Sequence, residues 1–154
     1  MSTHNTIVVK GTGVNQEALA NAEITPGHLV ELMSTGKFKV HATAGGNAAK
    51  IFAVEDELQG NPISTAYDAG DLVQARHMRP GEWVQAIAVS QGSAIVIGDF
   101  VESAAGGTLQ KHVADVSDSP NTTNQIIGIA REAIDNSDSA ADAIADSRFL
   151  VEIV

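Results

Sequence analysis

The sequence contains no cysteine and few aromatic residues. Without a thiol the chain cannot form a disulfide, a thiolate nucleophile or a Cys-based zinc site. Hydrophobic residues make up 44% of the chain but aromatic residues only 4%, so most of the apolar share is small and aliphatic. We therefore expect a thin core of small side chains, which suits short paired strands better than thick helical layers.

Positive charge is also scarce. Nine Lys and Arg residues face nineteen Asp and Glu residues, the formal net charge is −10, and the basic residues form no cluster. Release of counterions from nucleic-acid phosphates requires clustered basic side chains. We therefore expect no direct binding of nucleic acid, and we interpret the acidity as a source of solubility.

Long apolar runs are missing as well. No run approaches the length of about 20 residues that a membrane-spanning helix needs. The start, MSTHNTIVVK, lacks the charged and then apolar order of a secretion signal. We expect a soluble protein that is made in the cytosol and has no membrane partner, and a length of 154 residues allows one domain with a core.

The sequence does contain short apolar runs separated by turn residues, most clearly over residues 68–107. Turn signals about every ten positions between β-rich runs are typical of an antiparallel barrel or sandwich. No apolar stripe keeps a helical i, i+3, i+4 spacing over three turns. The predicted strands lie at residues 28–32, 37–41, 50–54, 72–73, 83–87, 94–97, 100–101, 108–113, 125–133 and 148–154.

We expect residues 1–24 to form an extended N-terminal arm and residues 25–154 a single β-rich domain. In the arm, TIVVK at 6–10 predicts a strand, and 15–22 fits a helical turn or two. This strand has no neighbouring hairpin partner, so it must pair either on the edge of its own domain or on another subunit. Near the other end, residues 115–124 predict a loop, and 135–146 fit a loop or a short helix over 140–144.

The histidines do not form a metal-binding motif. They lie at positions 4, 28, 41, 77 and 112, and no two are separated by the two to four positions that ligand pairs use. His41 shares the 37–41 strand with Lys39, and the alternation places both on its polar face. We expect no metal and no other cofactor.

Signals for catalysis are absent too. No Gly-x-Ser-x-Gly elbow occurs, and Gln-Gly-Ser at 91–93 is better explained as a hairpin turn. Carboxylates pair at 55 and 57 and at 68 and 71, which chance explains in an acidic chain. The glycines at 11–13 and 45–46 lack the setting of a phosphate loop and indicate flexibility. We expect no enzyme activity and no catalytic residue.

The single tryptophan is the most distinctive side chain on the strand at 83–87. It is expected in the core or at its rim, and a contact role is the alternative because a large amphipathic ring is a frequent hot spot. Combined with the N-terminal strand that lacks a local partner, it defines the candidate contact residues of the chain: Thr6, Ile7, Val8, Val9, Lys10 and Trp83.

A series of short segments follows in order from residue 50 to the end. They are Ala-Val-Glu-x-x-Leu-x-Gly at 53–60, Tyr-x-Ala-Gly-Asp at 67–71, Arg-Pro-Gly at 79–81, Gly-Asp-Phe-Val-Glu-Ser at 98–103, Gly-Thr-Leu at 107–109, and the closing segments at 128–135 and 148–154. No single segment is specific, but the ordered combination resembles the capsid decoration (cement) proteins of tailed bacteriophages.

The resemblance implies an all-β fold with one or two short helices, a compact barrel or sandwich of the β-tulip or β-clip type. It also implies a protein on the outer face of the assembled phage head, made in the host bacterial cytoplasm. There it would bridge subunits of the major capsid protein and reinforce the shell, as a homotrimer or a homodimer, without catalytic residues or a cofactor.

A non-viral β-barrel carrier or a carbohydrate-binding module is the alternative, because Gly-Asp corners occur in such domains as well. Against it, no hairpin carries a Met-Lys-Met modification site, and one Trp and one Tyr make a poor platform for a sugar. An enzyme is a third interpretation and would need a site assembled from loops.

Overall fold

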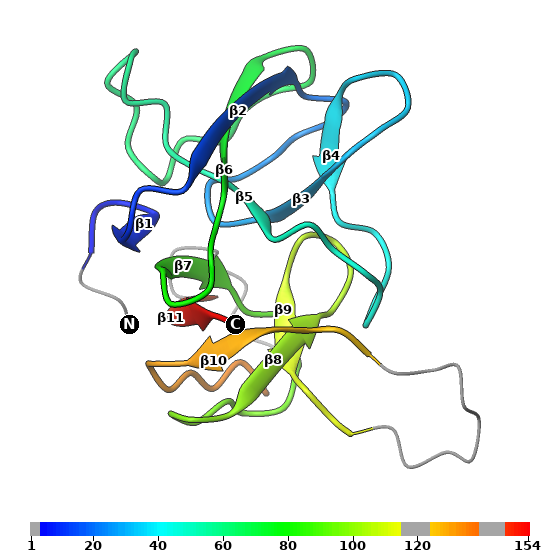
Figure 1. Cartoon of the computed structure of the whole chain (residues 1–154), viewed down its shortest axis with the longest axis vertical. Helices are drawn as coiled ribbons and strands as arrows, with labels where there is room; N and C mark the ends of the chain where they lie inside the picture. Colours follow the sequence, from blue (N-terminus) through cyan, green and yellow to red (C-terminus); the bar gives the residue numbers. More distant parts are fainter. Residues whose placement is uncertain (1–3, 115–123, 139–146) are drawn as a thin grey trace.

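Two antiparallel β-sheets make up the protein, in a computed structural model that describes residues 4–114, 124–138 and 147–154. Eleven strands lie in these ranges, and the described residues include no α-helix. The all-β class expected from the sequence is therefore confirmed. In Figure 1 the five-stranded sheet lies above the six-stranded one.

The six-stranded sheet curls back on itself. Its strands, in spatial order, are β1 (Val8–Lys10), β7 (Trp83–Ile87), β11 (Arg148–Ile153), β10 (Ile126–Ala130), β8 (Phe100–Ser103) and β9 (Leu109–Lys111). A parallel bridge between Ala88 and Leu109 returns β9 to the end of β7. The backbone N–H of Val89 donates to Leu109 O at 2.9 Å, so five of the six strands close into a small barrel.

The five-stranded sheet closes in a similar way. Its strands, in spatial order, are β2 (Val14–Leu19), β6 (Leu72–His77), β5 (Ile51–Ala53), β3 (Leu29–Leu32) and β4 (Phe38–Val40). Just after β2, Ala20 forms a parallel bridge with Phe38. The N–H of Asn21 donates to Phe38 O at 2.8 Å, which joins the two outer strands at one end.

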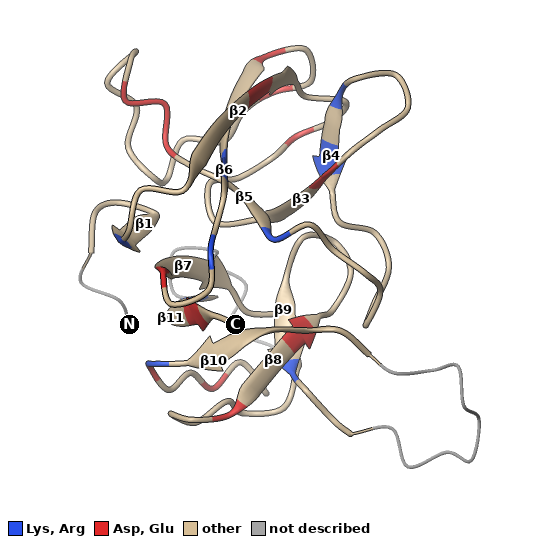
Figure 2. Cartoon of the chain, in the orientation of Figure 1, with Lys and Arg blue, Asp and Glu red and all other residues tan. Residues whose placement is uncertain are grey.

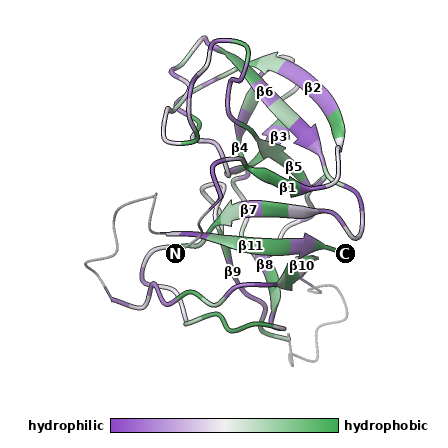
Figure 3. Ribbon diagram, turned by 90° about the vertical axis from the view of Figure 1, so that its left-hand side faces the viewer, coloured by the Kyte–Doolittle hydropathy of each residue, from purple (hydrophilic) through white to green (hydrophobic). Residues whose placement is uncertain are grey.

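Strand β5 is buried on both faces and links two hydrophobic cores. Phe52 packs into the core of the six-stranded sheet, whereas Ile51 and Ala53 face a second core inside the five-stranded sheet. A strand covered on both sides has no polar face, which explains the continuous apolar run Ile-Phe-Ala. The apolar colouring of Figure 3 follows β5, β7 and β11.

A buried arginine connects the two sheets. Arg148 of β11 is only 3% exposed. Its Nη2 atom donates to Pro26 O at 3.0 Å and to Ile63 O at 2.7 Å, on the loops that flank the five-stranded sheet. These charge-assisted hydrogen bonds satisfy a cation that burial would otherwise leave unpaired.

Most predicted strands are confirmed with ends shifted by a few residues, but three details differ. Residues 15–22, expected as a helical turn, lie largely in β2, because the backbone pairs with β6 along its full length. The predicted strand over 94–97 is only a single bridge between Ile95 and Ile134. The loop predicted over 115–124 and the alternatives for 140–144 fall almost wholly outside the described residues.

His41 is a third correction. It was expected on a polar face but is only 2% exposed. Its Nδ1 atom lies 2.8 Å from Ser103 Oγ, and its Nε2 atom lies 3.1 Å from Asn47 O. The alternation failed because β4 ends at Val40, so the chain has already left the strand at His41.

The sequence left open where the N-terminal strand pairs, and in the structure it pairs within the chain. β1 pairs with β7 and β2 pairs with β6, so both strands in the range expected to form an arm belong to the two sheets. Ile7 is fully buried. Burial of this side chain in its own core favours pairing within the chain over pairing with a neighbour.

We expect the stability of the fold to depend on the charge state of His28. Burial, with a smaller contribution from Arg148, lowers the pKa of His28 to about 4. Its Nδ1 atom accepts a hydrogen bond from the N–H of Thr25 at 3.1 Å, which requires an unprotonated nitrogen. Because the unfolded chain binds this proton more tightly, stability is complete above about pH 6.5 and falls as the pH drops towards 4.

Urea unfolding at pH 7.5 and pH 4.5 tests this expectation. From the size of the pKa shift, the free energy of unfolding of the wild type should fall by about 2–3 kcal/mol more between these pH values than that of His28→Asn. The asparagine keeps a hydrogen-bond acceptor but cannot be protonated. Equal losses in the two proteins would show that His28 does not titrate on unfolding.

Candidate functional site

The start of the chain is fixed to the rest of the protein by buried polar contacts. The N–H of Ile7 donates to Glu55 Oε2 at 3.0 Å, and Ile7 O accepts from the N–H of Gln85 at 2.8 Å. The side-chain amide of Gln85 donates to Thr6 O at 2.7 Å and to His4 O at 3.0 Å. Glu55 and Gln85 are both buried. Residues 4–7 therefore have a defined position beside β7.

Lys10 and Trp83, which face each other across β1 and β7, form a compact surface cluster with two further residues. Lys10 Nζ lies 3.5 Å from the centroid of the Trp83 ring, and Arg131 Cζ lies 5.8 Å from it. Trp83 Nε1 donates to Glu152 Oε2 at 3.1 Å, and Arg131 Nε donates to the same oxygen at 2.7 Å. Such cation–π contacts orient both the ring and the cations.

The structure thus brings the six candidate contact residues together on two neighbouring strands and the segment leading into them. Thr6 and Lys10 are exposed, Val8, Val9 and Trp83 are half-buried, and only Ile7 is fully enclosed. The sequence did not predict that Arg131 and Glu152 would join Trp83, because Arg131 follows β10 and Glu152 lies in β11, both far along the chain. The role of the six candidates as contact residues remains a prediction.

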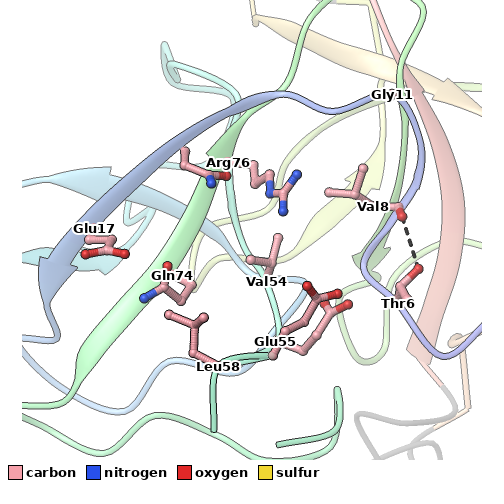
Figure 4. A pocket seen from close by; sticks show the side chains of 11 residues that line it. Thr6, Val8, Gly11, Glu17, Val54, Glu55, Leu58, Gln74 and Arg76 are labelled. Carbon is pink, nitrogen blue, oxygen red and sulfur yellow. Dashed lines mark hydrogen bonds between the residues drawn. The ribbon is translucent and has the colours of Figure 1, made fainter. Parts of the chain in front are cut away.

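A groove lies between β1 and the β2–β6 pair (Figure 4). It has a volume of about 320 Å³, and Val8, Val54 and Leu58 form its apolar part. Its polar part includes three carboxylates and one guanidinium, from Glu17, Glu55, Glu57 and Arg76. In the sequence the pairing of Glu55 and Glu57 was attributed to chance, but in the structure both line the same groove. No signal in the sequence indicated Glu17 or Arg76.

The turn between β1 and β2 sets the shape of this groove. Glu82 Oε1 accepts hydrogen bonds from the backbone N–H groups of Thr12 at 3.1 Å and Gly13 at 3.2 Å. Its Oε2 atom accepts one from the backbone N–H of Arg79 at 2.8 Å. Burial alone would raise the pKa of Glu82, but these backbone hydrogen bonds outweigh it and lower the pKa below its usual value.

Gly11 is required at this turn, where the sequence indicated only flexibility. Its φ of 100° lies in the region that favours glycine. A Cβ atom at this position would collide with the side chain of Glu82. The glycines at 11 and 13 therefore allow a tight and fixed turn.

Elsewhere in the described residues, basic side chains and the side chains that could bind a metal are dispersed. Figure 2 shows the basic residues as single blue segments spread over both sheets. In the described part of the chain no group of three or more His, Cys, Asp or Glu side chains is placed to hold a metal ion. The same residues include no helix long and apolar enough to cross a membrane.

No protein-family model and no curated protein matches this sequence. Among solved structures, the chain is similar to the N base of the head fiber gp8.5 of bacteriophage phi29. The TM-score is 0.53 at 20% sequence identity, and the match covers 93% of this chain and 95% of the other. At this identity the similarity establishes a shared fold.

The position of β1 predicts that Ile7 contributes to global stability. Ile7→Ala should lower the free energy of unfolding by about 2–4 kcal/mol, because it leaves a cavity in the core. The control Val14→Ala, at a side chain that is 49% exposed, should change it by no more than about 0.5 kcal/mol. Urea denaturation measures both, and an unchanged Ile7→Ala variant would mean that β1 folds independently of the domain.

Proposed function

We propose that this protein is a structural component of a tailed-phage head, which binds the outer surface of the assembled shell and bridges neighbouring subunits of the major capsid protein. In this role it stabilises the shell and has no catalytic function. Its partners are the major capsid protein and further copies of itself, as a homotrimer or a homodimer. It is made in the bacterial cytoplasm and resides on the exterior of the virion.

The similarity to a phage head-fiber base is the observation that carries the proposal. It covers nearly the full length of both chains, so it concerns the whole domain and not one recurring motif. The ordered segments between residues 53 and 154 that resemble decoration proteins support the same assignment from the sequence. Both likenesses point to proteins of a phage head.

The surface of the molecule is compatible with this role. A bridging protein needs at least two contact regions, and the chain presents the Trp83 cluster on the six-stranded sheet and the groove beside β2 on the other. The carbohydrate-binding alternative is less well supported, because Lys10 lies over the Trp83 ring at 3.5 Å and occupies a position where a sugar would stack. A net charge of −10 also disfavours contact with packaged DNA.

Co-sedimentation with capsids tests the proposal directly. The protein should pellet with expanded, assembled heads of the phage that encodes it and should bind free capsid subunits much more weakly, because one molecule has to span several subunits. Saturated heads should also withstand a higher temperature before they release DNA. Equal binding to heads and to free subunits would contradict bridging, and no binding to either would contradict the function.

We expect Trp83 to be a hot spot of this binding. Trp83→Ala should weaken the affinity for heads by about 30-fold, a loss of about 2 kcal/mol, whereas Trp83→Phe should retain part of it. Leu32→Ser, at a side chain of β3 that is 51% exposed, is the control and should bind like the wild type. If Trp83→Ala binds heads normally, the ring serves only the packing of its own cluster.

A further inference from the structure

We propose that strand β2 and the groove beside it form a second contact surface, which takes an extended segment of the major capsid protein carrying a lysine or arginine. This inference rests on the proposed function and specifies the chemistry of the partner. Three features of the described residues support it: an open strand edge, exposed leucines and an excess of carboxylates.

The open edge follows from the register of β2 with β6. The N–H of Ala20 donates to Asp71 O at 2.8 Å, so the residues of β2 with the same parity direct their backbone groups towards β6. Asn15 and Glu17 have the opposite parity, and their N–H and C=O groups point away from the sheet. Within the described residues these groups have no hydrogen-bond partner.

This edge also lacks the usual protection against strand pairing. Edge strands are commonly guarded by a lysine, a proline or a bulge. β2, Val-Asn-Gln-Glu-Ala-Leu, contains no lysine or proline, and its register with β6 is uninterrupted over six residues. By contrast, β1 has three residues, an irregular register and a terminal lysine. An unguarded regular edge is suited to the addition of a strand.

Exposed leucines lie on the same side of the molecule. Leu19 and Leu72 are cross-strand partners on β2 and β6 and are 46% and 47% exposed. Leu58 lines the groove and is 84% exposed. Leucines so accessible and so close to an open edge indicate a surface that apolar side chains of a partner cover.

The charges of the groove indicate that the partner contributes a basic side chain. Glu17 and Glu57 are exposed, and Glu55 uses one oxygen for the N–H of Ile7. The one cation that lines the groove, Arg76, donates from its Nη1 atom to Thr12 O at 2.6 Å. The groove therefore has a net negative charge, which a lysine or arginine neutralises while its aliphatic stem packs on Leu58 and Val54.

The same charges argue against a second copy of this chain as the occupant. Each copy has nineteen acidic and nine basic residues, so a segment of a second copy is on average a poor match for the negative charge of this groove. A capsid segment with a basic side chain has the complementary charge. The occupant is therefore a segment of the shell to which the protein is proposed to bind.

Proline substitutions distinguish the open edge from the paired one. Asn15→Pro removes an N–H that points away from β6, so the protein should fold with a Tm close to that of the wild type. It should bind assembled heads about tenfold more weakly, because it blocks a backbone hydrogen bond to the added strand. Gln16→Pro is the matched control: it removes an N–H paired with β6 and should lower the Tm instead.

Charge substitutions test the basic residue. Glu17→Gln combined with Glu57→Gln should weaken binding to heads at 50 mM salt by about tenfold, and the difference from wild type should shrink at 500 mM salt. Glu23→Gln is the control, since Glu23 is exposed but does not line the groove. If Glu23→Gln weakens binding as much as the double variant does, the effect comes from the overall charge of the protein, and the inference is overturned.

The outcomes separate this inference from the proposed function. If wild type binds heads and folded Asn15→Pro binds them equally, the inference is overturned while the function stands. If wild type does not bind heads, the proposed function has failed first. If light scattering shows that Asn15→Pro changes the oligomeric state but each oligomer still binds heads, the edge joins copies of this chain, and the capsid segment as occupant is overturned.

Discussion

The arrangement of this protein depends on how one edge of strand β7 is shared. β11 occupies the other edge of β7, so a single row of backbone groups remains for every further neighbour. Gln85 gives its N–H to Ile7, and Val89 gives its N–H to Leu109. Along this edge, β7 itself therefore holds the N-terminal strand, and the residues just after β7 close the barrel through β9. Lys10 meets Trp83 because β1 can pair only along β7 itself.

Local patterns predicted the strands well wherever the residues themselves encode a pleated and buried segment. Trp83–Ile87 and Arg148–Ile153 were found because their apolar residues alternate or run continuously between turn signals. β2 was not found, since Leu19 is its only large apolar residue besides Val14 and propensity alone favours a helical turn. Its strand conformation comes from pairing with β6, which lies more than fifty positions away along the chain.

The candidate site shows the same division between local and long-range information. Six candidate contact residues could be named from the sequence because a strand without a neighbour and a lone tryptophan are visible locally. Arg131 and Glu152 join Trp83 only through the order β7-β11-β10, which no local pattern encodes. Likewise Glu55 was noticed as half of an acidic pair and within the segment at 53–60, yet neither pattern indicated its hydrogen bond to Ile7. Gly11 was interpreted as flexible, although Glu82 holds its turn closed.

A rigid connection between the two proposed contact surfaces has a consequence for binding. Both surfaces include residues from the first nineteen positions, and the turn that separates β1 from β2 is fixed by the hydrogen bonds of Glu82, whose side chain packs against Gly11 where any other residue would place its Cβ. Two surfaces held at a fixed separation bind simultaneously only where partner sites have the same separation. Then the second contact is intramolecular and adds to the first without further loss of translational freedom. In the function we propose, an assembled lattice would supply such sites and a free subunit would not, so rigidity at this turn would let a small β-domain select a shell over its building blocks.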